Sequence, residues 1–190
     1  MTIATRLLLA IGLAAAAVGC SSRAEPSTPS TPSTPSSPSS PARLPTDPPR
    51  VAKQWDAGAY KDKPCALLTD QQAQGMGYRV PGSVLTVDDG IAQCRRIDGS
   101  NQFVIRFFGT DLVGRIYRRE MIWPGINWAT PMKVVGQPAL KSALPGSDEC
   151  LIAVAIADNQ GFDVRIDEKG VDPCVHATQA AETVMHNLGA

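Results

Sequence analysis

Apolar residues recur at every second position in several short stretches of the chain, and this pattern predicts β-strands. In segments 102–108 and 162–167, every second residue is large and apolar, as in a strand with one buried face. Segment 150–157 is continuously apolar, which is typical of a strand buried on both faces. Asp98-Gly99-Ser100 favours a hairpin turn between two of these segments. The predicted strands are 92–97, 102–108, 132–135, 150–157 and 162–167.

Three other stretches carry the spacing or the end signals of helices. Thr69 and Gln72 form a capping-box pattern at the start of a short helix. Residues 111–120 place their apolar residues at helical spacing. Asp172 and Pro173 suit the N-cap and first residue of a last helix, whose apolar stripe is Cys174, Ala177, Ala181, Val184 or Met185, and Leu188. Together the elements predict an α+β fold, in which an antiparallel sheet packs against helices as an α/β sandwich.

Residues 1–19 have the pattern of an export signal. Arg6 precedes the apolar run Leu7–Val18, whose 12 residues are too few to cross a membrane as a helix, since a crossing takes about 20. The run ends at Ala17-Val18-Gly19-Cys20, which resembles the lipobox of bacterial lipoproteins. That resemblance implies cleavage before Cys20, a diacylglyceryl group on its thiol, and acylation of the new amine by a chain such as palmitate. The alternative is an ordinary secretory signal followed by an unrelated cysteine.

A proline-rich stretch follows Cys20. Residues 26–41 read PSTPSTPSTPSSPSSP, and a proline at every third position excludes helix and sheet and favours polyproline II. Residues 20–50 therefore form a lipidated, disordered stalk that extends up to roughly 90 Å at about 3.1 Å per residue. The stalk is either O-glycosylated or an unmodified linker. Residues 51–190 remain as a single globular domain.

The cysteines beyond Cys20 are even in number, as expected for an exported domain with two disulfides. Three connectivities are possible for Cys65, Cys94, Cys150 and Cys174. We prefer Cys65–Cys94 and Cys150–Cys174, because each closes a local loop. A metal site is the alternative. However, no two cysteines have the C-x-x-C spacing of two intervening residues, and no histidine lies near Cys65, Cys94 or Cys150 in the sequence.

The charges balance, with 18 Lys+Arg against 18 Asp+Glu, which argues against a nucleic-acid-binding protein. Within this balance, residues 95–119 hold six arginines against two aspartates, and residues 148–182 are rich in acids. Such clusters either form one basic and one acidic face that steer a charged partner or cancel each other in three dimensions.

Two of the three tryptophans lie within residues 121–128, close to several arginines. An exposed aromatic loop there would suit a lipid or protein ligand. The alternative is that both tryptophans cover the core. The candidate binding residues are Trp123, Trp128, Arg115, Arg118 and Arg119.

Catalytic patterns are missing from the sequence. It contains no G-x-S-x-G, H-E-x-x-H, P-loop or G-x-G-x-x-G motif. His176 and His186 lie ten residues apart on the predicted last helix, about 15 Å along its axis, and so do not chelate one ion. We therefore expect no catalytic residue, no metal, no cofactor and no enzymatic activity.

Several short motifs, taken in order, resemble one family. They are Cys65-Ala66-Leu67-Leu68-Thr69, Cys94, Val135-Gly136-Gln137-Pro138-Ala139, Cys150 and Asp172-Pro173-Cys174. This order is similar to that of actinobacterial lipoproteins that carry a domain of unknown function, including the LprB-like and LprC-like mycobacterial proteins. The resemblance covers about residues 60–188 and the leader. It implies an envelope lipoprotein and supplies no catalytic residues.

We therefore expect a lipoprotein anchored to the extracytoplasmic face of the cell membrane. Its domain would act as a non-enzymatic binding or accessory module for an envelope protein, a cell-wall component or a lipid. The alternative is a carrier or sensor of a lipid or other apolar ligand, which needs a cavity of about 300 Å³ or more. A cavity lined by Trp123, Trp128 and Phe107 would favour that alternative.

Overall fold

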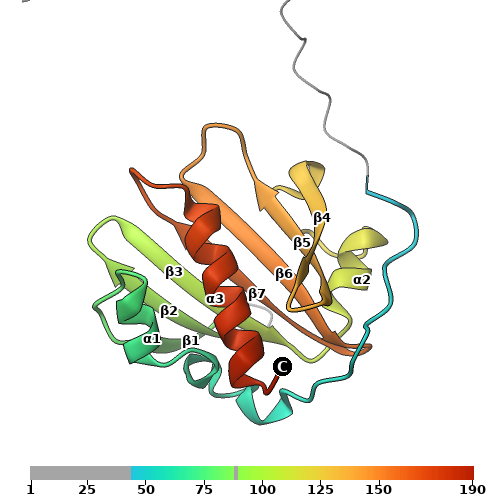
Figure 1. Ribbon diagram of the computed structural model, residues 1–190, viewed down its shortest axis with the longest axis horizontal. Coiled ribbons are helices and arrows are strands. Elements are labelled where there is room, and N and C mark those ends of the chain that lie inside the picture. The colour runs from blue at the N-terminus through green and yellow to red at the C-terminus, as the bar shows by residue number, and fades with distance from the viewer. Residues whose placement is uncertain (1–43, 88–89) are drawn as a thin grey trace, which may run out of the picture. The chain divides into compact units, whose positions relative to one another are not determined.

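The computed structural model describes residues 44–87 and 90–190. The predicted leader, the predicted lipidation site Cys20 and the predicted stalk up to residue 43 lie outside the described residues. Within the described part, the domain consists of one seven-stranded sheet, three α-helices and three short 3-10 helices (Figure 1). The strands are β1 (Ser83–Thr86), β2 (Ala92–Asp98), β3 (Asn101–Phe108), β4 (Ala129–Val134), β5 (Gln137–Ala143), β6 (Glu149–Ala157) and β7 (Gln160–Asp167). The helices are η1 (Gly58–Tyr60), η2 (Pro64–Leu67), α1 (Asp70–Gly75), α2 (Leu112–Tyr117), η3 (Ile126–Trp128) and α3 (Pro173–Asn187).

The sheet joins two runs of consecutive antiparallel strands. Its order is β1-β2-β3-β7-β6-β5-β4, so β1–β3 form one run and β4–β7 form the other. The runs meet where β3 pairs with β7, and all six pairings are antiparallel. The prediction of an antiparallel sheet with helices is confirmed, and β7 is its central strand.

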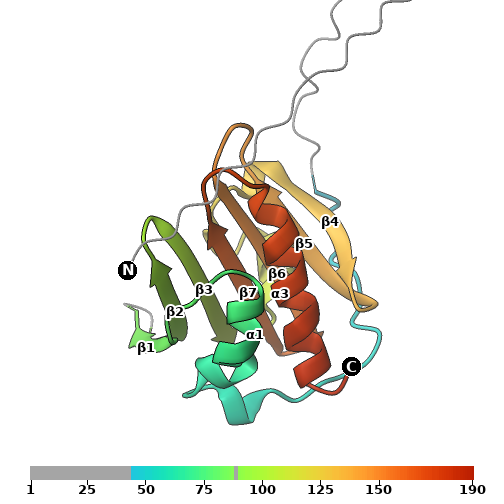
Figure 2. The same cartoon turned by 60° about the vertical axis from the view of Figure 1, so that its left-hand side comes forward.

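One face of the sheet, the first face, is covered by α3. This helix crosses β6 and β7 (Figure 1), and α1 lies beside it on the same side of the sheet (Figure 2). The two helices are tied by Asn187, whose Nδ2 donates to the Leu67 carbonyl at 2.8 Å and to Gln72 Oε1 at 2.9 Å. Alternate residues of β3, β6 and β7 supply the floor of this core, including Phe103, Ile105, Ile152, Val154, Phe162 and Val164.

The opposite or second face is covered by the short helix α2 and by the loop after it. Its core contains Leu112 and Ile116 of α2 and Trp123 of the loop, packed on Leu151 and Ala153 of β6. Both faces of β6 are therefore buried, which explains why residues 150–157 are continuously apolar. Small residues at this face, such as Ala153 and Ala155, let α2 and the loop approach the sheet closely.

The local signals in the sequence account for several element ends. Thr69 Oγ1 accepts from the Gln72 N–H at 3.2 Å, and Gln72 Oε1 accepts from the Thr69 N–H at 2.9 Å. This is the predicted capping box, and it begins α1. Asp172 caps α3 by accepting from the Cys174 N–H at 2.9 Å, with Pro173 as the first helical residue.

The structure departs from the sequence predictions in two strands that carried no apolar alternation. β1 is a four-residue edge strand with every residue exposed, so no buried face marked it. β5 contains Pro138, a residue that lacks an N–H donor and is disfavoured inside sheets. Pro138 is tolerated because its pairing is with Lys133 of β4, while the ladder to β6 begins only at Ala139.

Two element boundaries and the burial of one residue also differ from prediction. The helix expected over 111–120 ends at Tyr117, because Arg119 takes a left-handed conformation with φ 59°. β4 begins at Ala129, three residues before the predicted strand 132–135. Segment 162–167 was expected to be half-buried, yet Asp163 on its polar face is fully buried. Its carboxylate is neutralised by Arg106 of β3, with an Nε–Oδ1 distance of 2.9 Å.

Gly161 lets β7 pass close beneath α2, and this contact is testable. A Cβ at Gly161 would lie 2.8 Å from both Leu112 Cβ and the Val154 oxygen. Gly161→Ala is expected to lower the free energy of unfolding by about 1–3 kcal/mol, measured by urea denaturation. Gly75→Ala is the matched control, because a Cβ there meets nothing within 4 Å. Equal stability of the two variants would contradict the close packing of α2 on β7.

Candidate functional site

A pocket of about 710 Å³ opens where β2 begins and β3 ends. It is lined by Ile91 and Ala92 at the start of β2 and by Phe107 and Phe108 at the end of β3. Arg115 of α2 also lines it. The volume lies within the range of about 300–1,000 Å³ that holds small molecules in proteins.

The lining of this pocket combines apolar surface with charge. Phe107 and Phe108 are buried residues that also belong to the two cores. Met121 and Ile122, from the turn after α2, complete the apolar part, and Ile122 is 97% exposed. Such a pocket suits an amphipathic ligand, whose apolar part would pack on these side chains and whose polar or charged group would meet the charged ones.

Lys61 and Arg115 supply the positive charge of the pocket, and Asp62 supplies one negative charge. Among the described residues, neither cation forms a side-chain hydrogen bond or an ion pair with a protein group. The charge of Arg115 still affects Glu120. The pKa of Glu120 is lowered, first by its hydrogen bond with Arg118 and to a smaller extent by the positive charge of Arg115. Two cations that have no bonded partner within residues 44–87 and 90–190 give the pocket donors for an anionic group beside its apolar surface.

The five candidate binding residues do not come together in one site. Trp123 is 1% exposed and packs in the core of the second face. Trp128 lies in η3 and is 39% exposed. The hypothesis of one exposed aromatic loop is therefore wrong for Trp123, because the small side chains of β6 leave room for its ring. Neither tryptophan lines the pocket, whereas Phe107 does.

The arginines of the same segment also separate. Arg115 lines the pocket. Arg118 pairs with Glu120 at 2.7 Å and with Asp111 at 3.2 Å, and these pairs are exposed. Arg119 donates to Asn127 Oδ1 at 3.3 Å. The runs of charge in the sequence are thus split into local pairs, and Arg115 alone of these three faces the pocket.

A second cluster joins residues that the sequence analysis did not connect. Glu168 Oε2 lies 2.6 Å from His176 Nδ1 and accepts from the Tyr78 hydroxyl at 3.3 Å. Burial of the hydroxyl, together with the neighbouring Glu168 carboxylate, raises the pKa of Tyr78. Tyr78 lies 90 residues before Glu168 and the three residues follow no known motif, so no sequence signal indicates the cluster.

The four domain cysteines form two disulfides, Cys65–Cys94 and Cys150–Cys174, which is the preferred connectivity. The first ties η2 to β2, and the second ties β6 to the first turn of α3. Each bond joins a fully buried cysteine, Cys94 or Cys150, to a partly buried one. Both bonds lie at the first face of the sheet, on the side of α3.

Residues 44–87 and 90–190 contain no group of three or more His, Cys, Asp or Glu side chains arranged to hold a metal ion. None of their helices has the length and apolar character needed to cross a membrane.

These features define a disulfide-bonded domain built on one antiparallel sheet, with a ligand-sized pocket beside the second face. The chain belongs to a family described as "Protein of unknown function (DUF3558)", whose model matches residues 15–187. Comparisons with curated proteins and with solved structures gave no match.

The different surroundings of the two tryptophans lead to a stability prediction. Trp123→Ala empties a buried site and is expected to lower the free energy of unfolding by about 3–5 kcal/mol. Trp128→Ala removes a partly exposed ring, and its cost is expected to be about 1 kcal/mol or less. Urea denaturation of both variants beside the wild type measures the difference. Equal losses in the two variants would contradict the placement of Trp123 in the core.

Proposed function

We propose that this chain is a lipid-anchored protein on the extracytoplasmic face of the cell membrane, and that its domain binds an envelope component without catalysing a reaction. The observation that carries the proposal is the order of features along the chain. An apolar leader ends at Cys20, a proline-rich stalk follows, and a domain with two disulfides comes last. Disulfides are typical of proteins in oxidising compartments.

The similarity of the motifs to LprB-like and LprC-like mycobacterial lipoproteins supports the same location and suggests an actinobacterial envelope. Acyl chains on Cys20 would anchor the protein stably, since each buried CH₂ contributes about 0.8 kcal/mol. The stalk of residues 20–50 would then hold the domain, residues 51–190, away from the membrane. The zero charge balance supports a partner other than nucleic acid.

Lipidation at Cys20 is the first test of this proposal. Cells expressing the full chain are fed an alkyne-bearing palmitate analogue, and the protein is isolated and coupled to a fluorophore. We expect labelled wild-type protein in the membrane fraction, because the thiol of Cys20 is the acceptor. Cys20→Ser should lose the label and leave the membrane fraction.

Ser22→Ala is the matched control, since it changes a small polar residue next to the cleavage site without removing the thiol. It should keep the label and the membrane location. An unlabelled wild-type protein, or a labelled Cys20→Ser variant, would refute the anchor and leave the secretory alternative.

A second function, carrier or sensor of an amphipathic ligand, is favoured by the pocket of about 710 Å³. Its apolar surface, from residues such as Phe108 and Met121, would cover a hydrocarbon portion. Arg115 and Lys61 would bind an anionic head, because neither has a bonded protein partner in the described part of the chain. Fatty acids and anionic lipids have this combination of groups.

Native mass spectrometry of the mature protein, secreted from an actinobacterial host, tests the second function. A carrier is expected to retain one lipid per chain, identified after solvent extraction. Arg115→Gln should weaken binding of added oleate by about tenfold, because a charge-assisted hydrogen bond is lost.

Arg119→Gln is the control, because Arg119 is exposed and does not line the pocket. It should bind oleate as the wild type does. A protein that shows only its ligand-free mass, with and without oleate, would exclude the carrier function and leave the binding-module proposal in place.

A further inference from the structure

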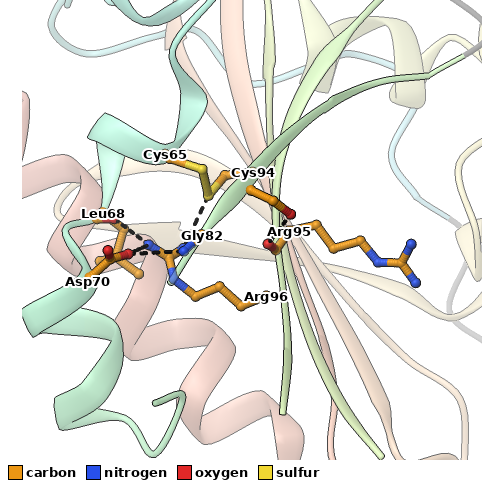
Figure 3. Close-up of a disulfide and its surroundings, with 8 residues drawn as sticks. Cys65, Leu68, Asp70, Gly82, Cys94, Arg95 and Arg96 are labelled. Carbon is orange, nitrogen blue, oxygen red and sulfur yellow. Dashed lines mark hydrogen bonds and ion pairs between the residues drawn. A yellow bond between two sulfur atoms is a disulfide. The ribbon is translucent and has the colours of Figure 1, made fainter. Parts of the chain in front are cut away.

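A buried arginine contacts one sulfur atom of the Cys65–Cys94 disulfide (Figure 3). Arg96 is 1% exposed, and its Nη1 donates to Cys94 Sγ at 3.2 Å. Its Nη2 donates to the Leu68 carbonyl at 3.0 Å and to Asp70 Oδ1 at 2.9 Å. A guanidinium is always charged, so this sulfur lies against a permanent positive charge.

The two cysteines of this bond differ in burial. Cys94 is fully buried, whereas Cys65 is partly exposed. Gly82 lies directly over the bond, since a Cβ there would be 2.6 Å from Cys94 Sγ and 2.9 Å from Cys65 Sγ. Gly82 covers both sulfurs alike, so it is the partial exposure of Cys65 that makes this cysteine the one open to a thiol from solution.

We propose that Cys65–Cys94 is a thiol-exchange site, at which a low-molecular-weight thiol becomes attached to Cys65 while Arg96 holds the departing Cys94 thiolate. The incoming thiolate sulfur forms a bond with Cys65 Sγ as the Cys65–Cys94 bond breaks. The electron pair of the broken bond leaves on Cys94 Sγ, and the mixed disulfide remains on Cys65. Charge and electrons balance, because one thiolate is consumed and one is formed.

Arg96 speeds this reaction because exchange is faster when the leaving thiol is more acidic. A neighbouring cation favours the thiolate over the thiol, and Arg96 Nη1 already points at the atom that gains the charge. Asp70 acts in the opposite direction, since its carboxylate shares the guanidinium and also accepts from the Gly82 N–H at 3.1 Å. The hydrogen bond from Gly82, and after it the one from Arg96, hold the pKa of Asp70 below its ordinary value. The carboxylate therefore stays charged.

The Cys150–Cys174 bond provides a comparison within the same molecule. Cys150 is fully buried and Cys174 partly buried, as in the first bond. Within the described residues, no side chain donates to the sulfur of Cys150, the atom that would leave after attack on Cys174. The N-terminal end of α3 favours a thiolate at Cys174. This would speed exchange only if the incoming thiol attacked Cys150, because only then does Cys174 leave as the thiolate.

The experiment measures exchange at both bonds in the oxidised mature protein under native conditions. Reduced glutathione is added, samples are quenched with acid over time, free thiols are alkylated, and peptides are mapped by mass spectrometry. We expect the Cys65–Cys94 bond to open at least about tenfold faster than Cys150–Cys174. Glutathione should appear on Cys65, and the alkyl group on Cys94.

Two substitutions test the role of charge in opposite directions. Asp70→Asn removes the competing charge and should speed exchange at Cys65 several-fold, while the amide oxygen of Asn remains an acceptor for the Arg96 and Gly82 donors. Arg96→Met removes the cation and should slow exchange toward the rate of the Cys150–Cys174 bond. Neither substitution should alter that second bond.

A further variant keeps the proposal testable if Arg96→Met does not fold. Cys65→Ser leaves Cys94 as a free thiol, and its alkylation rate against pH reports its ionisation. The midpoint should lie below the range of an ordinary thiol, about 8.5, and should fall further when Asp70→Asn is added. Equal opening rates for the two bonds, glutathione on Cys94, or an ordinary midpoint unmoved by Asp70→Asn would each overturn the proposal.

Discussion

The buried carboxylate of Asp163 sets the constraint on which the whole sheet depends. Asp163 lies on the central strand and is paired in register with Arg106 of β3. Burying a carboxylate without a positive partner costs several kcal/mol, so β3 and β7 are held in the register that brings these side chains together. A slip of one residue would also turn the apolar face of β7 away from α3. This pairing joins the two halves of the chain.

With this pairing fixed, the two faces of the sheet take different roles. The first face is locked by α3 and by both disulfides, one in each run of strands. The second face carries the short α2, the loop after it and the segment that contains Leu44 and Val51, and the pocket opens near Phe108. The first face is therefore the more extensively cross-linked one, and the pocket lies beside the less covered second face.

Elements with a strong local signal could be predicted, and those fixed by distant contacts could not. The capping box at Thr69, the hairpin after Asp98 and the Asp172–Pro173 helix start depend on neighbours in sequence, and each was found. β1 has no buried face, and β5 contains Pro138, whose place beside β4 is clear only from the register. The pocket joins β2, β3 and α2, and its cation Arg115 could not be distinguished from Arg118 by sequence.

The six arginines of residues 95–119 illustrate the difference between architecture and function. Arg96 and Arg106 have carboxylate partners and face the interior of the fold, so their charge is used to hold strands and loops in place. Arg115 has the same side chain, yet it lines an apolar pocket without an ion-pair partner among the described residues. A guanidinium beside apolar surface gains most by binding an anion when no carboxylate of the chain pairs with it, and none within residues 44–87 and 90–190 pairs with Arg115. Partner geometry, rather than the density of arginines in the sequence, therefore identifies Arg115 as the residue at which ligand binding should be sought.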